Sequence, residues 1–231
     1  MGGVKERAVA VPTPGIKITE KGRERDRLMD THQSWEFGGP WGVTAMITLF
    51  PVLMYYLWIC LWFYDGQFAH PTSLADIVPF FQRMGRHVYE DAFPTPRALI
   101  GYGGLMVVEF VLAWIVPGYM QEGLPVPSLN YKTLMYKCNA LGCLYCTLII
   151  AAALHFSGVY RLTQIIEHFG EYMTVSMIAG FAVSFATYFH AVFTHTTHRM
   201  SGNFMYDFFM GAALNPRIGP IDLKMWAEVR I

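Results

Sequence analysis

The sequence predicts an all-α fold, a polytopic transmembrane helix bundle with four spans in this chain that forms part of a larger bundle. Only 15% of the 231 residues are charged and 54% are hydrophobic, whereas a soluble domain carries about a quarter charged residues. Long uncharged segments separate the charges, and aromatic rings flank the first of these segments. Such segments are expected to be helical, because a helix satisfies its own backbone polar groups inside a bilayer.

Four apolar segments are long enough to cross a membrane. The first, 37–64, holds no charged residue over 28 positions, more than the roughly 20 helical residues that span a bilayer core. The other predicted spans are 98–121, 138–160 and 172–198. Tryptophans at both ends of the first span are typical of rings that lie at the two headgroup layers. Pro51 should kink this helix.

The rest of the chain divides into a charged arm, 1–36, loops between the spans, and a segment, 199–231, after the last span. In the first loop, Ser73 and Asp76 have the spacing of a capping box. Apolar residues also recur there on one helical face, namely Leu74, Ile77, Phe81, Met84 and Val88. We expect a helix that lies along the membrane surface.

Small residues follow one face of the fourth span. They are Ser176, Gly180 and Ser184, beside Ala179, Ala182 and Ala186. Because small side chains let another helix approach closely, the fourth span is predicted to lie inside the bundle.

Lys and Arg are distributed unevenly among the connecting segments. The arm, the second loop and the C-terminal segment hold thirteen, whereas the first and third loops hold four. Cytoplasmic loops retain positive charge. Both termini of the chain and the second loop are therefore predicted to be cytoplasmic.

Composition also excludes some classes of protein. The net charge is zero and the pI is near 7.1, so the basic surface of a nucleic-acid-binding protein is absent. The four cysteines lie in apolar runs and do not indicate a disulfide framework. Cys143-x-x-Cys146 lacks two further zinc ligands at matching spacing, and the glycines of 101–104 follow no strand, so we interpret both motifs as packing sites.

Glu109 is a carboxylic acid near the middle of the second span, where a charge costs about 3 kcal/mol. A proton relay or a substrate contact would explain it, which makes Glu109 a catalytic candidate. The alternative is a structural glutamate that is protonated or hydrogen-bonded.

Three histidines at the end of the fourth span suggest a second kind of chemistry. His195-x-x-His198 is one fragment of the histidine boxes that membrane di-iron hydroxylases use to hold two metals. His190 lies nearby, and the other five histidines are scattered singly. The set of possible ligands is therefore far too small for two metals. We therefore predict no metal site, and the di-iron hydroxylase is the disfavoured alternative.

The pattern of residue types changes after the fourth span. Glycines and a proline break regular structure between 202 and 219, and polar groups alternate with aromatic rings. One interpretation is a membrane-surface turn held by its aromatic rings, with Asp207 and Arg217 as internal partners. The other is a shaped functional loop.

The segment 202–217 resembles the first signature of the ERG4/ERG24 family of sterol reductases. Its glycines, Tyr206-Asp207, aromatic residues and the ending Leu-Asn-Pro-Arg are all in register. Glu36-Phe-Gly-Gly-Pro-Trp-Gly42, the segment 54–59 and Tyr136-Lys-Cys-Asn-Ala140 resemble the branch that reduces the C-24(28) double bond of the sterol side chain.

The resemblance implies a multi-pass protein of the endoplasmic reticulum membrane that acts in ergosterol biosynthesis. Such enzymes use NADPH to deliver hydride to one carbon of a sterol double bond while an acid protonates the other. It implies a sterol substrate and a lipid bilayer as surroundings, while the neutral charge balance predicts no nucleic-acid partner. The signature residues are then site candidates: Tyr206 and Asp207 as catalytic residues, and Asn215, Arg217, Asp222 and Lys224 in a substrate or cofactor loop.

The second, arginine-rich signature of the family is absent from this chain. The resemblance therefore implies that the residues binding NADPH lie mainly outside it, and that the chain is an N-terminal part without activity of its own. A non-catalytic sterol-binding membrane protein is the alternative function.

Overall fold

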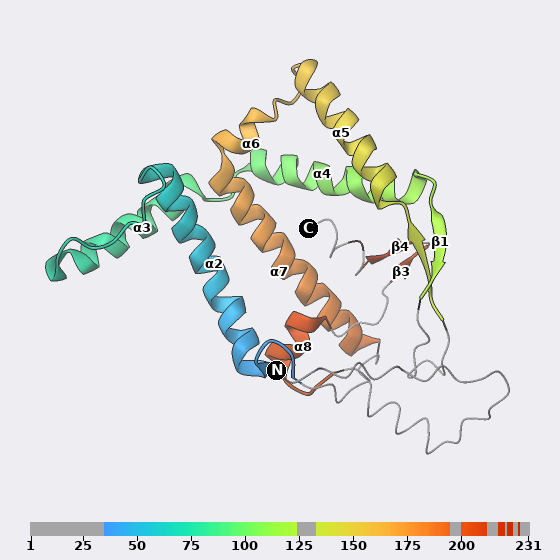
Figure 1. Cartoon of the computed structure of the whole chain (residues 1–231), viewed down its shortest axis with the longest axis horizontal. Helices are drawn as coiled ribbons and strands as arrows, with labels where there is room; N and C mark the ends of the chain where they lie inside the picture. The colour runs from blue at the N-terminus through green and yellow to red at the C-terminus, as the bar shows by residue number, and fades with distance from the viewer. Residues whose placement is uncertain are drawn as a thin grey trace, which may run out of the picture.

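The computed structural model describes residues 35–123, 133–194, 200–211, 217–219, 221–223 and 226 (Figure 1). Its elements, in chain order, are α2 (Gly39–Phe63), η1 (Leu74–Asp76), α3 (Ile77–Asp91), α4 (Pro96–Ile115), β1 (Tyr119–Glu122), β2 (Met135–Cys138), α5 (Ala140–Phe156), α6 (Thr163–Glu167), α7 (Phe169–Phe193), α8 (Phe204–Met210), β3 (Arg217–Ile218) and β4 (Ile221–Asp222). Most of the predicted arm, 1–36, lies outside the described residues.

Three helices, α2, α4 and α7, are long and apolar enough to cross a membrane. Three of the four predicted spans are thereby supported. The third predicted span, 138–160, is represented by α5, which has 17 residues and is about 26 Å long at 1.5 Å per residue. The total of four spans stays a prediction.

The predicted second span, 98–121, is wrong at its C-terminal end. The helix α4 ends at Ile115, and β1 begins at Tyr119. Pro117 and Gly118 lie between them, and both residue types end helices. Within α2, by contrast, the helix continues through Pro51.

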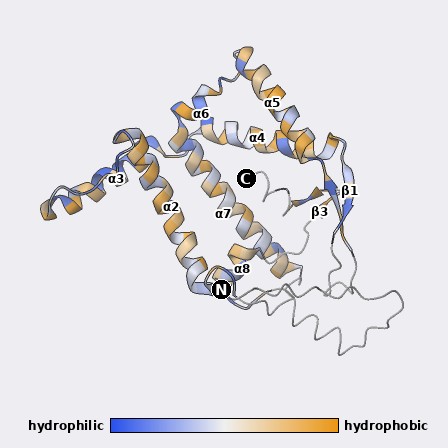
Figure 2. Ribbon diagram, in the orientation of Figure 1, coloured by the Kyte–Doolittle hydropathy of each residue, from blue (hydrophilic) through white to orange (hydrophobic). Residues whose placement is uncertain are grey.

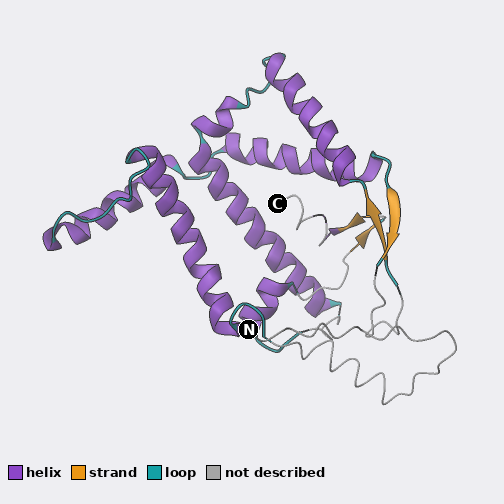
Figure 3. Cartoon of the chain, viewed as in Figure 1, coloured by secondary structure: helices purple, strands orange, loops and turns teal. Residues whose placement is uncertain are grey.

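The all-α prediction is also incomplete, because Figure 3 shows two small antiparallel sheets beside the helices. The strands β1 and β2 pair from Tyr119 with Cys138 to Glu122 with Met135. The strands β3 and β4 pair Arg217 with Asp222 and Ile218 with Ile221. Both pairs lie in segments that the sequence predicts to be a span end and loops.

The first loop contains the expected helix, α3, without a side-chain cap and with a different buried face. Asp76 accepts hydrogen bonds from the backbone N–H and the hydroxyl of Thr72, at 3.0 and 3.3 Å, so the predicted Ser73 capping box is wrong. Phe80 and Met84 are buried, whereas Phe81 is 65% exposed. The inner face is therefore rotated from the predicted one, and placement at the membrane surface stays a prediction.

The hydrophobic core gathers where α2, α3 and α7 meet. Its buried residues are Trp58, Ile59, Cys60, Ala69, Phe80, Met84, Ala92 and Met173. Helix α7 contacts α2, α3, α4, α6 and α8, but only 11% of its most apolar window is buried, so the interior position of the fourth span stays a prediction. Its small-residue face is not closely packed, because a Cβ at Gly180 would meet no described atom within 4 Å.

Much of the helical surface is apolar. Figure 2 shows hydrophobic colours along most of α2 and α5, and large apolar side chains such as Leu49, Ile100, Ile149 and Phe193 are more than 60% exposed. Exposure of this kind is expected for helices whose solvent is lipid.

The connecting segments meet in two groups. The start of α4 in the first loop contacts the start of α7, where Thr95 hydrogen-bonds to Glu171, and Trp62 stacks on Phe169. The second-loop strand β2 contacts β4 of the C-terminal segment. This grouping agrees with the predicted sidedness of the loops, while the cytoplasmic assignment itself stays a prediction.

Candidate functional site

The predicted catalytic pair, Tyr206 and Asp207, lies on α8, which packs against α2 and α7. Asn203 caps α8 by accepting the Tyr206 N–H at 3.1 Å. The Asp207 carboxylate is buried and accepts the backbone N–H groups of Ser201 and Gly202, at 2.7 and 3.1 Å. In this structure Asp207 closes the turn that precedes α8, and its catalytic role stays a prediction.

The motif at 36–42 folds against α8. Its backbone turns through positive φ angles at Phe37, Gly38 and Gly39, of 54°, 76° and 67°. A methyl group at Gly42 would overlap the carbonyl oxygen of Phe37, so only glycine fits this close approach. The two family motifs thereby form one cluster at the start of α2, in which Tyr206 packs edge-to-face on Trp35 with ring centroids 4.8 Å apart.

Glu109, the third catalytic candidate, lies apart from this cluster. It is half-buried on α4, and the hydroxyl of Thr147 on α5 donates a hydrogen bond to it. The structure therefore does not bring the three catalytic candidates together in one described contact. The hydrogen bond fits the structural interpretation of Glu109, and its catalytic role stays a prediction.

The predicted substrate or cofactor loop is only partly described. Asn215 and Lys224 lie outside the described residues, and Arg217 is described by its backbone in β3 alone. Asp222 on β4 is 7% exposed and lines a cavity of about 570 Å³ together with β2 and the start of α5.

A third family motif, 136–140, holds the end of α4. Lys137 Nζ donates to the carbonyls of Ala113 and Trp114, at 3.2 and 2.8 Å. Asn139 Nδ2 donates to Ala113 and Val116, at 3.0 and 2.9 Å. These side chains satisfy carbonyls that a helix end leaves without partners, and the lysine charge complements the helix dipole.

A second cavity, of about 780 Å³, lies between α4, α5, α6 and α7. Its walls are mostly apolar and include Ile100, Leu105, Val108, Ile150 and Leu154. The volume falls within the range of small-molecule sites, and an apolar wall with a few polar groups is typical of them.

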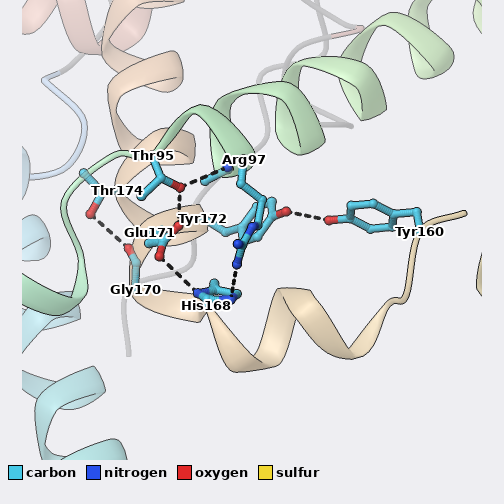
Figure 4. Close-up of polar contacts among 9 residues, drawn as sticks. Thr95, Arg97, Tyr160, His168, Gly170, Glu171, Tyr172 and Thr174 are labelled. Carbon is cyan, nitrogen blue, oxygen red and sulfur yellow. Dashed lines mark hydrogen bonds and ion pairs between the residues drawn. The ribbon is translucent and has the colours of Figure 1, made fainter.

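One end of this cavity adjoins a network of polar side chains at the start of α4 and α7 (Figure 4). The Thr95 hydroxyl donates to Glu171, and His168 Nδ1 lies 3.1 Å from the other Glu171 oxygen. Arg97 contacts His168 Nε2. Because a guanidinium can only donate, Nε2 is the acceptor in this contact, which leaves Nδ1 to donate to Glu171.

Two tyrosines complete this end. Tyr160 precedes α6 and Tyr172 lies on α7, and their hydroxyl oxygens are 2.5 Å apart (Figure 4). A Cβ at Gly101 would lie 2.6 Å from the Tyr172 hydroxyl and 3.1 Å from that of Tyr160. The predicted packing role is confirmed for Gly101. It is wrong for Gly103 and Gly104, because a Cβ at either position would meet no described atom within 4 Å.

Sequence reasoning missed this end of the cavity. Tyr160 ends the third apolar run and Tyr172 begins the fourth. This placement is typical of aromatic residues at a membrane–water interface. The signal that could have indicated them is the pairing of tyrosines at adjoining ends of two spans with a glycine on a third.

The histidines and cysteines are the candidate metal ligands of this chain. Among the residues that the structure describes, no group of three His, Cys, Asp or Glu side chains is arranged to hold a metal ion. His195 and His198, on which the histidine-box alternative rests, lie outside the described residues.

The structure thus combines three candidate membrane spans with an apolar cavity, and the comparison with known proteins gives its class. Residues 31–231 match the ergosterol biosynthesis ERG4/ERG24 family. The chain belongs to this family, which confirms the resemblance seen in the signature motifs.

Its relatives include named sterol reductases. The chain is 41% identical to the Delta(24(24(1)))-sterol reductase of Gibberella zeae, over 90% of this chain and 35% of that protein. It is 39% identical to the Delta(24(24(1)))-sterol reductase of Aspergillus fumigatus, over 87% of this chain and 43% of that protein. It is 33% identical to the Delta(14)-sterol reductase of Dictyostelium discoideum, over 94% and 47%. The chain thus spans between 35% and 47% of the length of these relatives.

Proposed function

We propose that this chain is part of a sterol reductase of the endoplasmic reticulum membrane that reduces the C-24(28) double bond of a sterol side chain with NADPH, a step in ergosterol biosynthesis. The names of the Gibberella and Aspergillus relatives support this reaction. The structural observation that carries the proposal is the apolar cavity between α4, α5, α6 and α7, because a sterol is an almost wholly apolar molecule.

The reaction adds a hydride to one alkene carbon and a proton to the other, and NADPH supplies the hydride. A cavity that excludes water protects the cationic character that develops on the alkene. We keep Glu109, Tyr206 and Asp207 as the proposed proton donors or electrostatic partners. Each already has a hydrogen-bond partner in the resting structure.

The described residues do not fit NADPH by themselves. Its phosphate groups require several cationic or backbone donors. Among the described residues that line the smaller cavity, Lys137 is the one cation. Its ammonium group already donates a hydrogen bond to a carbonyl at the end of α4. Arg217 and Lys224 therefore stay proposed residues of a substrate or cofactor loop.

A chimera tests the function directly. Residues 31–231 would replace the aligned segment of the Gibberella reductase, and membranes with the chimera would receive NADPH and a 24(28)-unsaturated sterol. We expect a sterol reduced at C-24(28), detected by mass spectrometry and absent without NADPH. A folded chimera that binds the sterol without reducing it would instead favour a non-catalytic sterol-binding protein.

A further inference from the structure

The 780 Å³ cavity is polar mainly at the end formed by Arg97, Tyr160, Gln164 and Tyr172. The hydroxyl groups of Ser176 and Thr147 also line the cavity, but each already donates a hydrogen bond to an acceptor within the chain. Ser176 donates to the carbonyl of Met173 at 2.8 Å, and Thr147 lies at the opposite end, bonded to Glu109.

The charged groups at the polar end neutralise one another. Arg97 contacts His168, which lies against Glu171, and Glu171 also accepts from Thr95. A positive guanidinium and a negative carboxylate are thereby joined through the imidazole of His168. The end of the cavity therefore suits an uncharged polar group better than a carboxylate or a phosphate.

The two tyrosine hydroxyl groups have bonding capacity to spare. They carry two protons between them, and their contact of 2.5 Å uses one. Whichever tyrosine accepts in that contact keeps a proton to donate, and both oxygens keep lone pairs. The nearby Tyr102 hydroxyl is buried with no hydrogen-bond partner among the described residues, and its ring packs in the same cluster as Tyr172.

An alcohol satisfies this arrangement, because it donates one hydrogen bond and accepts another. From this end the walls are apolar along α4, and the eight positions from Gly101 to Val108 rise about 11 Å. That length is comparable with a fused sterol ring system. A rigid apolar body with a single terminal hydroxyl therefore matches the cavity.

We propose that the Tyr160–Tyr172 pair binds the 3-hydroxyl group of the sterol and thereby fixes its orientation, an inference that rests on the proposed function. The rings then lie along α4 and α5, and the sterol side chain points toward Thr147 and Glu109. The tyrosines act as positioning residues, far from the reacting double bond, and Glu109 lies at the end that receives the side chain.

Competition binding to the full chain, purified in detergent, tests the hydroxyl contact. The probe is tritiated 24-methylenecholesterol, and the competitors are the unlabelled sterol and its 3-O-methyl ether, which cannot donate. We expect the ether to bind about tenfold more weakly, the size of one net hydrogen bond. Tyr160→Phe and Tyr172→Phe should reduce this preference, whereas Tyr145→Phe, which alters an exposed tyrosine outside the lining, should keep it.

The outcomes separate this inference from the proposed function. Saturable sterol binding with equal affinity for the ether would overturn the hydroxyl contact and leave the sterol substrate standing. No saturable sterol binding at all would count against the proposed function.

A photoreactive group on the sterol side chain tests the orientation independently of any substitution. We expect cross-links to α4 and α5 around Val108 and Thr147. Cross-links concentrated around Tyr160 would show the reverse orientation and overturn the proposal.

Discussion

The hydroxyl oxygen of Tyr206 accepts the backbone N–H of Glu36 at 3.2 Å, across 170 positions of the chain. The contact joins the start of α2 to α8, and the Tyr206 ring packs on Trp35 beside it. Two motifs that are far apart in the sequence therefore form one structural unit.

Two substitutions at Tyr206 should distinguish the contribution of its hydroxyl group to stability from that of its ring. Tyr206→Phe removes one hydrogen bond and is expected to lower the free energy of unfolding by about 1 kcal/mol. Tyr206→Ala also removes the ring contacts and should cost about 2 to 3 kcal/mol. The measurement is the unfolding of the full chain in detergent, followed by tryptophan fluorescence. Equal losses in the two variants would contradict the assignment of the larger share to the ring.

Asp207→Asn should destabilise the chain although it conserves shape. Both carboxylate oxygens accept backbone N–H groups, and the amide would present its own N–H₂ to one of them. We expect a loss of about 2 kcal/mol in the same unfolding measurement. Glu90→Gln, on an exposed position of α3, is the matched control and should stay within about 0.5 kcal/mol. An Asp207→Asn variant with an unchanged free energy of unfolding would show that the turn does not need the carboxylate.

Two glycines should respond in opposite ways to alanine. At Gly42 the added methyl overlaps the Phe37 carbonyl oxygen, so we expect a loss of about 3 kcal/mol in the free energy of unfolding. At Gly180 the space is open among the described residues, and alanine should be neutral or stabilise α7 by up to about 1 kcal/mol. Thermal unfolding of the two variants side by side gives the comparison. A strong loss at Gly180 would show that another helix closes on that face.

The turn before α3 should loosen in acid. The backbone N–H of Thr72, and after it Arg83, lower the pKa of Asp76 below its usual value of 3.8. Because the folded pKa is the lower one, the stabilisation is complete above the unfolded pKa and is lost as pH falls through the folded pKa. Hydrogen exchange at the Thr72 amide should therefore quicken below about pH 4 relative to neighbouring amides. In Asp76→Asn this additional acid step should disappear, and its persistence would assign the change to another group.

The sequence predicted the membrane class, most of α2, α4 and α7, and the family, because these depend on local hydropathy and on motifs that are contiguous in the chain. It also predicted a helix in the first loop from apolar spacing. It missed the end of α4 and the rotated inner face of α3, since both depend on what the neighbouring segments cover. Short strands such as β1 carry little signal of their own, because all four of its residues are exposed and its sequence shows no alternation of apolar and polar residues.

The candidate site was likewise predicted only in part from the sequence. The motif residues Tyr206 and Asp207 were found from sequence, and the structure shows that they hold the start of α2 and the turn before α8. The cavity and the Tyr160–Tyr172 pair were decided only by tertiary structure. The hydroxyl groups of Tyr160, before α6, and Tyr172, on α7, meet because Gly101 on α4 leaves room for them. No single segment encodes that approach, whereas the hydropathy that places each segment in the membrane is a property of the segment alone.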